Sequence, residues 1–181
     1  MKIATSIFLA ALLTLPTAQA RPEAQREQFY SALSGSWTGQ LEYRDFQSNE
    51  HTVLPAWLDV KPSADGHSLE FTYTYDDGPT KTVTETSTVT IDPTKREYTT
   101  GSSHDHADTY RIDDLTPGKR GDNWQLKLSG TGRENDHPVD VRITITIDRN
   151  LYRLKKETRQ PGQEFQFRDA YTFTRRMPPH P

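Results

Sequence analysis

The chain has 181 residues, with 22 Lys and Arg against 25 Asp and Glu, which gives a formal net charge of −3. This near balance argues against a general nucleic-acid-binding protein, because such proteins carry a clear excess of basic residues. The chain contains no Cys, which excludes disulfides and cysteine nucleophiles and means that stability has to come from a packed core.

The first twenty residues have the three parts of a secretory signal peptide. Lys2 supplies the positive start, residues 3–15 form the apolar centre, and Ala18-Gln19-Ala20 matches a small-residue cleavage site. The apolar run is too short to cross a bilayer, and no second such run follows it. We therefore expect residues 1–20 to be removed after Ala20, a secreted or periplasmic location, and no stable membrane insertion.

Residues 21–34 are predicted to form a short helix that caps the barrel described below. Pro22 and Glu23 suit a helix N-terminus, where a missing N–H costs nothing and a carboxylate meets the helix dipole favourably. Phe29 and Leu33 are four residues apart and therefore share a face. The sequence leaves two interpretations open: a lid over one barrel mouth, or a helix packed against the outside or the end of a sheet.

After residue 34 the chain alternates between apolar and polar residues, as β-strands do. In the second strand Trp57 and Leu58 compete for the inward face, and Pro55 indicates an edge or a bulge because it lacks an N–H. Residues 130–138 are predicted to be a loop. The predicted strands cover residues 37–43, 53–60, 69–75, 83–91, 96–100, 110–112, 124–128 and 141–147, followed by two more before residue 176.

Three turns predict which residues face one another. A three-residue loop at Asp77-Gly78-Pro79 pairs Tyr73 with Val83 and Phe71 with Glu85. A turn at Arg149-Asn150 pairs Ile147 with Tyr152 and Ile145 with Leu154. A turn at Pro161-Gly162 pairs Leu154 with Asp169 and Lys156 with Phe167, so that the last strand turns Phe165, Phe167, Asp169, Tyr171 and Phe173 inward.

About ten short strands joined by hairpins predict an all-β protein with one antiparallel up-and-down β-barrel. The barrel domain covers residues 35–176, and residues 177–181 form a C-terminal tail. A barrel also removes the exposed edges that an open ten-stranded sheet would present.

The stretch Gly35-Ser36-Trp37-Thr38-Gly39, followed by this meander, resembles the opening of the calycin superfamily, which contains lipocalins, fatty-acid-binding proteins and nitrobindins. The resemblance gives Gly35, Trp37 and Gly39 a structural role and implies that an Arg from near the chain end packs over Trp37. The candidates for that Arg are Arg168, Arg175 and Arg176.

Two departures from these families limit what the resemblance implies about ligands. Nitrobindins have a third Gly where this chain has Leu41, and they bind haem through a late His, whereas the late His here is His180 in a Pro-rich tail. Fatty-acid-binding proteins hold a carboxylate with an Arg-x-Tyr motif that the last two strands lack. We therefore expect no haem or other cofactor, and a simple fatty acid is disfavoured.

Charged residues on the predicted inward face point to an interior site, because burying a charge is costly unless it is paired or solvated. Glu85, Lys156 and Asp169 are predicted to orient the polar end of a small, partly apolar molecule. Alternatively, Lys156 and Asp169 form a structural ion pair, or a bulge turns one of them outward. The apolar part of the ligand would lie against Tyr43, Phe71, Tyr73, Tyr152, Phe167 and Tyr171.

Two further features have a functional interpretation and a simpler alternative. His104, His106 and Asp108 share one face of an extended segment, which suits zinc, but no apolar neighbours exclude water, so a solvated loop is favoured and no metal is expected. The basic residues Arg153, Lys155, Arg159 and Arg168 are predicted to face outward, either to meet an anionic partner or simply to be solvated.

Three functions are compatible with these observations. The favoured one is an exported barrel that binds a small molecule inside. The second is an enzyme that uses Glu85 or Asp169 as acid or base and Tyr73 or Tyr171 as proton donor. The third is a barrel with a filled core that acts as an envelope interaction protein. The sequence lacks the usual nucleophile elbow, phosphate-loop and zinc-protease motifs, which favours a binder over an enzyme. It gives no indication of the oligomeric state.

Overall fold

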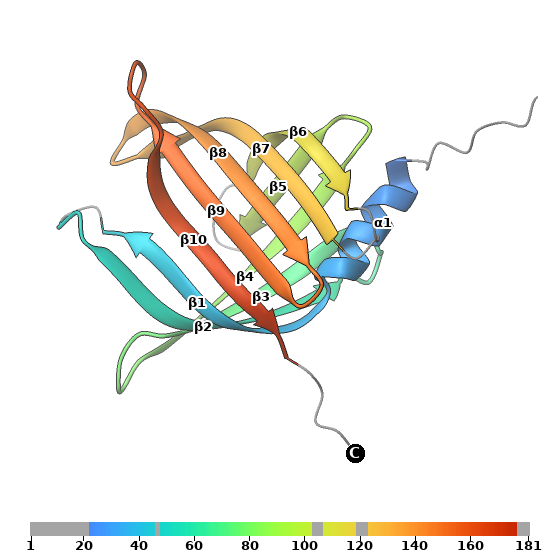
Figure 1. The fold of residues 1–181 in the computed structure, drawn as a ribbon, viewed down its shortest axis with the longest axis horizontal. Coiled ribbons are helices and arrows are strands. Elements are labelled where there is room, and N and C mark those ends of the chain that lie inside the picture. Colours follow the sequence, from blue (N-terminus) through green and yellow to red (C-terminus); the bar gives the residue numbers. More distant parts are fainter. Residues whose placement is uncertain (1–21, 46–47, 103–106, 119–122, 177–181) are drawn as a thin grey trace, which may run out of the picture.

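A computed structural model describes residues 22–45, 48–102, 107–118 and 123–176. The predicted signal peptide and C-terminal tail, together with His104 and His106, lie outside these residues. The described chain forms a closed barrel of ten antiparallel strands and one helix (Figure 1). The elements are α1 (Pro22–Leu33), β1 (Gly35–Arg44), β2 (His51–Pro62), β3 (Ser68–Asp76), β4 (Thr82–Asp92), β5 (Glu97–Ser102), β6 (Asp108–Pro117), β7 (Asn123–Glu134), β8 (His137–Asp148), β9 (Leu151–Arg159) and β10 (Gln166–Arg175).

Every strand pairs with its neighbours in the chain, and β1 pairs with β10 to close the barrel. This confirms the predicted up-and-down antiparallel barrel. Because consecutive strands run in opposite directions, the connections alternate between the end where α1 lies, here called the helix end, and the opposite end, here called the far end. Nothing in the described part of the chain is a helix long and apolar enough to cross a membrane.

Helix α1 covers one end of the barrel, and its apolar face is part of the hydrophobic core. Phe29 and Leu33 are fully buried, and the ring of Phe29 meets Trp124 edge-on at 5.7 Å. The Tyr30 hydroxyl accepts a hydrogen bond from the Ile91 N–H (2.9 Å) and donates one to the His67 carbonyl (3.2 Å). These contacts fix the helix on the barrel end, which excludes packing on the outside of the sheet.

The structure explains each of the three residues Gly35, Trp37 and Gly39 at the start of β1. Trp37 is fully buried, and its Nε1 donates to the Leu33 carbonyl at the end of α1 (2.9 Å). A Cβ atom on Gly39 would overlap the Thr172 carbonyl oxygen, so the glycine lets β10 approach β1. Gly35 has a φ of 125°, a conformation that suits glycine, and leaves room for Arg175.

In β2 the structure resolves the competition between Trp57 and Leu58. Leu58 is 1% exposed and faces the core, whereas Trp57 is 37% exposed on the outer face. Pairing between β2 and β3 begins only at Ala56, opposite Tyr75, so that residues 51–55 pair with β1 alone. Pro55 therefore lies at a local edge, as its missing N–H predicts.

The predicted pairing across the Arg149-Asn150 turn is confirmed, with Ile147 opposite Tyr152 and Ile145 opposite Leu154. The predicted loop at residues 130–138 is wrong, because β7 continues to Glu134 and β8 begins at His137. Asn135 and Asp136 both have positive φ values, of 46° and 65°, and make a tight two-residue hairpin turn.

The predicted register between β3 and β4 is wrong by two residues. Asp76 pairs with Thr82, so residues 77–81 form the loop and Glu85 lies opposite Tyr73 instead of Phe71. The Asp77 N–H donates to the Lys81 carbonyl (2.9 Å), which closes the longer loop. A shift of two residues preserves the alternation of faces, and Glu85 therefore still points to the interior.

The predicted register between β9 and β10 is also wrong. Lys156 pairs with Asp169 and Leu154 with Tyr171, and a β-bulge interrupts the ladder between Phe167 and Asp169. A bulge inserts one extra residue, here Arg168, and reverses the faces of the residues before it. Phe165 and Phe167 consequently leave the predicted inward face.

Candidate functional site

The barrel interior is packed near the helix end and hollow toward the far end. Trp37, Tyr152 and Phe173 are fully buried and fill the half next to α1. Beyond them lies a cavity of about 570 Å³, lined by residues of β3, β4, β5, β6, β8, β9 and β10. Its aromatic lining consists of five tyrosines, and its charged lining consists of Glu85, Asp108, Lys156 and Asp169.

Three of the tyrosines form a connected cluster. Tyr73 and Tyr75 alternate on the inward face of β3, and Tyr171 reaches them from β10. The Tyr75 and Tyr171 hydroxyls are 2.9 Å apart and share a hydrogen bond, while the Tyr73 and Tyr171 rings lie 5.1 Å apart. Burial raises the pKa of Tyr75 to about 12 and raises those of Tyr73 and Tyr171 well above their ordinary value. These hydroxyls therefore stay protonated at neutral pH and act as hydrogen-bonding groups.

The other two tyrosines lie on adjacent strands β5 and β6. The rings of Tyr98 and Tyr110 are 6.5 Å apart, and the Tyr110 hydroxyl donates to Asp108 Oδ2 at 3.4 Å. Gly130 on β7 makes room for Tyr110, since a Cβ there would lie 2.8 Å from the ring. Tyr98 is 7% exposed and lines the cavity, yet its hydroxyl has no hydrogen-bond partner among the described residues.

The charged pair on β9 and β10 is adjacent in register but does not form an ion pair. Asp169 lies directly opposite Lys156, and in the described part of the chain neither side chain makes a hydrogen bond or an ion pair. Burial raises the pKa of Asp169, against the lowering effect of the charges on Lys156 and Arg168. The expected alternative of a structural Lys156–Asp169 ion pair is therefore not observed, and the carboxylate is left available to a ligand.

Arg168 is placed differently from the sequence prediction. It was expected on the outer face, but at the bulge its Nε approaches Glu134 Oε1 at 3.5 Å and its Nη1 donates to the Arg44 carbonyl. Glu134 shares the alternating inward face of β7 with the buried Leu126 and Leu128. Arg168 and Glu134 lie in a second hollow of about 350 Å³ at the far end. The alternation of apolar residues along β10 gives no signal for a bulge.

Of the predicted ligand-binding residues, the structure brings together Tyr73, Glu85, Lys156, Asp169 and Tyr171 around the cavity. The other four are placed elsewhere.

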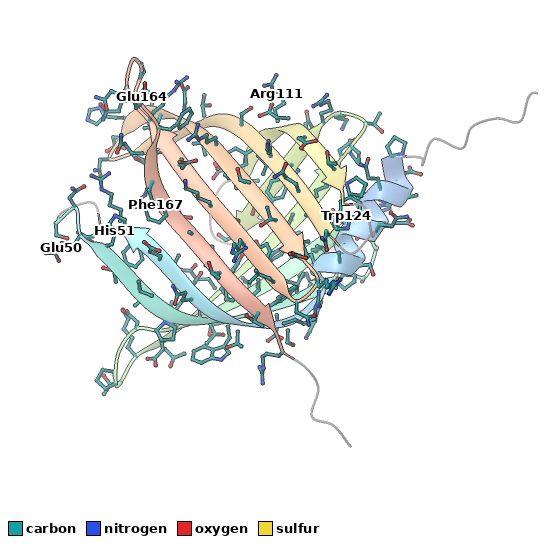
Figure 2. All side chains as sticks on the ribbon, in the orientation of Figure 1. Glu50, His51, Arg111, Trp124, Glu164 and Phe167 are labelled. Atoms are coloured by element: carbon teal, nitrogen blue, oxygen red, sulfur yellow. The ribbon has the colours of Figure 1, made fainter. Side chains whose placement is uncertain are left out.

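Phe71 and Tyr152 are buried in the core, and Tyr43 pairs with Asp169 at the end of β1 without lining the cavity. Phe167 stacks on His51 at 5.2 Å, and Figure 2 shows both near the far end. The placement of Phe167 corrects the prediction, and the bulge is its physical cause.

Tyr75, Tyr98, Tyr110 and Asp108 line the cavity but were not assigned to the site from the sequence. The three tyrosines occupy alternating strand positions that predict an inward face, so the apolar–polar alternation of the sequence could have identified them. Of the suggested zinc ligands only Asp108 is described, and the described residues contain no cluster of three potential metal ligands.

No family model matches this chain, and no curated protein matches it either. Two solved structures are similar in fold. Rv2717c from M. tuberculosis has a TM-score of 0.58 and 18% identity, over 83% of this chain and 96% of the other. The S-type phycobiliprotein lyase CPES from Guillardia theta has a TM-score of 0.54 and 10% identity, over 84% and 93%. At these identities the likeness concerns the fold alone, and with the closed ten-stranded barrel it supports a calycin-like fold.

Proposed function

We propose that this protein is exported and binds a small, partly apolar molecule in the cavity at the far end of the barrel. The observation that carries the proposal is a hollow interior whose walls combine aromatic rings with unpaired polar groups. A volume of about 570 Å³ falls within the range of ligand pockets, roughly 300–1,000 Å³. The tyrosine rings offer apolar contact, while Asp169 and the Tyr98 hydroxyl offer polar contacts that nothing in the described chain occupies.

The cavity argues against a filled-core barrel that acts only through its outer surface. The outer basic residues named in that interpretation are also largely paired: Lys155 contacts Glu157 at 2.9 Å, and Arg159 contacts Asp140 at 2.9 Å. Pairing of this kind reduces the attraction that the outer face exerts on an anionic partner.

A second candidate function, acid–base catalysis, finds support in one observation. Asp169 has a raised pKa and shares the cavity wall with Tyr171, as a buried general acid would. However, burial raises the pKa values of the tyrosines as well, which makes them poor proton donors near neutral pH. Binding is therefore the better-supported function.

The test is native mass spectrometry of the protein purified from its own host, compared with the denatured protein. A retained small molecule that is lost on denaturation is the expected result. The Asp169→Ala and Glu85→Ala variants should retain less of it, whereas Asp148→Asn, at an exposed position at the helix end, should retain as much as the unmodified protein. Unchanged retention in both cavity variants would refute the site assignment. A mature chain beginning at Arg21 is expected if the signal peptide is cleaved.

A further inference from the structure

The charges that line the cavity are unequal in sign. Three carboxylates, on Glu85, Asp108 and Asp169, face it from β4, β6 and β10, whereas one amine, on Lys156, faces it from β9. On the outer surface of the described chain many acidic residues have a basic partner, for example Glu157 with Arg142 at 2.7 Å. The cavity carboxylates form no such ion pair within the described residues. Glu85 and Asp108 are themselves solvent-exposed, and together with Asp169 they give the cavity wall an excess of negative charge that attracts cations.

The positions of these groups leave part of the cavity without a compensating cation. Lys156 is opposite Asp169 in the β9–β10 ladder and offsets its charge in part. Glu85 and Asp108 lie on the other side of the cavity, on the strands that flank β5, and the described residues paired with them, Tyr73 and Thr100, are not basic. These two exposed carboxylates would repel an anionic ligand and attract a cationic one.

The aromatic lining favours the same class of ligand. Tyrosine faces attract ammonium groups through the ring quadrupole, and Tyr98 on β5 lies opposite Tyr110, which is on the same strand as Asp108. Tyr98 is an independent observation: the residue is 7% exposed and lines the cavity, and its hydroxyl makes no hydrogen bond to another described residue. Its oxygen is a ready acceptor for an ammonium N–H.

We propose that the ligand of this cavity is an organic cation: an amine or quaternary ammonium compound with an aromatic or aliphatic body. The inference rests on the proposed function and makes it more specific. The cationic group lies on the β5–β6 side near Tyr98 and Asp108, while Glu85 on β4 adds to the negative charge of the cavity wall. The apolar body lies toward the tyrosine cluster of Tyr73 and Tyr171.

The test is a series of three probes with one body and three charges: phenylbutylamine, phenylbutanol and phenylbutyrate. Each is titrated at neutral pH into the full mature protein, with isothermal titration calorimetry for affinity and amide NMR shifts for location. We expect the amine to bind at least about tenfold more tightly than the alcohol, with the carboxylate weakest. The preference for the amine should shrink as salt is added, because salt screens the charges.

Substitutions of the charged cavity residues test whether these charges cause the preference for the amine. Glu85→Gln and Asp108→Asn should each reduce amine affinity several-fold while leaving alcohol affinity nearly unchanged, and Asp148→Asn should change neither. Lys156→Met acts in the opposite direction, because it removes the competing cation, and should strengthen amine binding. This variant keeps the proposal falsifiable if a carboxylate variant fails to fold.

The outcomes separate this inference from the proposed function. Equal or tighter binding of the alcohol or the carboxylate would overturn the cation assignment and leave the binding function standing. Failure of all three probes to shift the cavity resonances would also overturn it. In that case a neutral or anionic compound retained in native mass spectrometry would still support the binding function, whereas no retained compound would contradict both.

Discussion

The Arg175 guanidinium lies over the indole ring of Trp37, with its central carbon 4.0 Å from the ring centroid. The same guanidinium donates hydrogen bonds to the carbonyls of Ser34 (2.6 Å) and Ala32 (2.5 Å), at the end of α1. One side chain from the last strand therefore joins the helix, the first strand and the closing edge of the barrel. Among the three arginines that the calycin resemblance suggested, the structure identifies Arg175.

Replacing Arg175 is expected to destabilise the fold. Arg175→Ala removes a cation–π contact and two hydrogen bonds to helix carbonyls, and should lower the free energy of unfolding by about 2–3 kcal/mol. Arg175→Lys keeps the charge but loses the planar fork, and should recover only part of that stability. Urea unfolding measures both.

The matched control is Arg176→Ala, because Arg176 is the next residue and its side chain is exposed. Its backbone N–H donates to the Ser36 carbonyl, a bond that the substitution leaves intact. If Arg175→Ala and Arg176→Ala destabilise the protein equally, Arg175 does not have the joining role described above.

The sequence predicts the barrel well because its strands alternate apolar with polar residues and its turns contain residues typical of hairpins. The Arg149-Asn150 turn predicts the pairing of Ile147 with Tyr152 because a two-residue hairpin allows one register. The Asp77-Gly78-Pro79 turn predicts the wrong register, because closure of the longer loop depends on the contact between Asp77 and Lys81, which alternation does not reveal.

The site is less predictable because its geometry depends on contacts between distant strands. The apolar residues of β10 keep their alternation through the bulge at Arg168, so the sequence does not reveal it. The bulge moves Phe167 away from the predicted inward face and turns Arg168 toward Glu134. The fit of Tyr110 against Gly130 depends on close packing between neighbouring strands. Sequence reasoning locates the inward face, and tertiary packing decides which half of it is hollow.

The ionised carboxylate of Asp169 should lower the free energy of unfolding at neutral pH. Burial raises its pKa in the folded state above the ordinary value of 3.8, so the folded protein holds a proton that the unfolded chain releases. Stability therefore falls as the pH rises from about 3.8 through the raised pKa. The charges that face Asp169 modify this window: Lys156 and Arg168 lower the pKa, and Glu134 raises it.

Asp169→Asn should accordingly be more stable than the unmodified protein at pH 7, and the difference should vanish below pH 3.8. The measurement is thermal unfolding as a function of pH for both proteins. Asp148→Asn, an exposed substitution at the helix end, should show no such difference. A variant that is equally stable at every pH would mean that the Asp169 carboxylate carries no burial cost.

Glu157 should show the opposite dependence. The hydrogen bond from Arg142 holds the pKa of Glu157 at about 2, below its ordinary value of 4.5, and Lys155 adds to the effect. A depressed pKa contributes stability above pH 4.5 that is lost as the pH falls toward 2. Glu157→Gln should therefore cost about 1 kcal/mol at neutral pH and much less at pH 2, as measured by urea unfolding. An equal cost at both pH values would show that the charge is not responsible.

The hydrogen bond between Tyr75 and Tyr171 should appear as a coupling energy. Tyr75→Phe and Tyr171→Phe each remove one partner of a bond that joins β3 and β10 across the interior, and each should cost about 1 kcal/mol. The double variant should cost less than the sum, because the second substitution removes a hydroxyl that has already lost its partner. Additive costs would indicate that the two hydroxyls do not interact in solution.

Tyr98 should separate stability from binding. Tyr98 is 7% exposed, and its hydroxyl makes no hydrogen bond to another described residue, so the hydroxyl adds no such bond to the stability of the fold. Tyr98→Phe should therefore leave the free energy of unfolding unchanged or raise it slightly, in contrast to Tyr75→Phe. If the hydroxyl contacts the ligand, the same variant should bind the retained molecule several-fold more weakly in a competition assay. A Tyr98→Phe protein that is destabilised like Tyr75→Phe, and that binds normally, would show that the hydroxyl serves the fold and not the ligand.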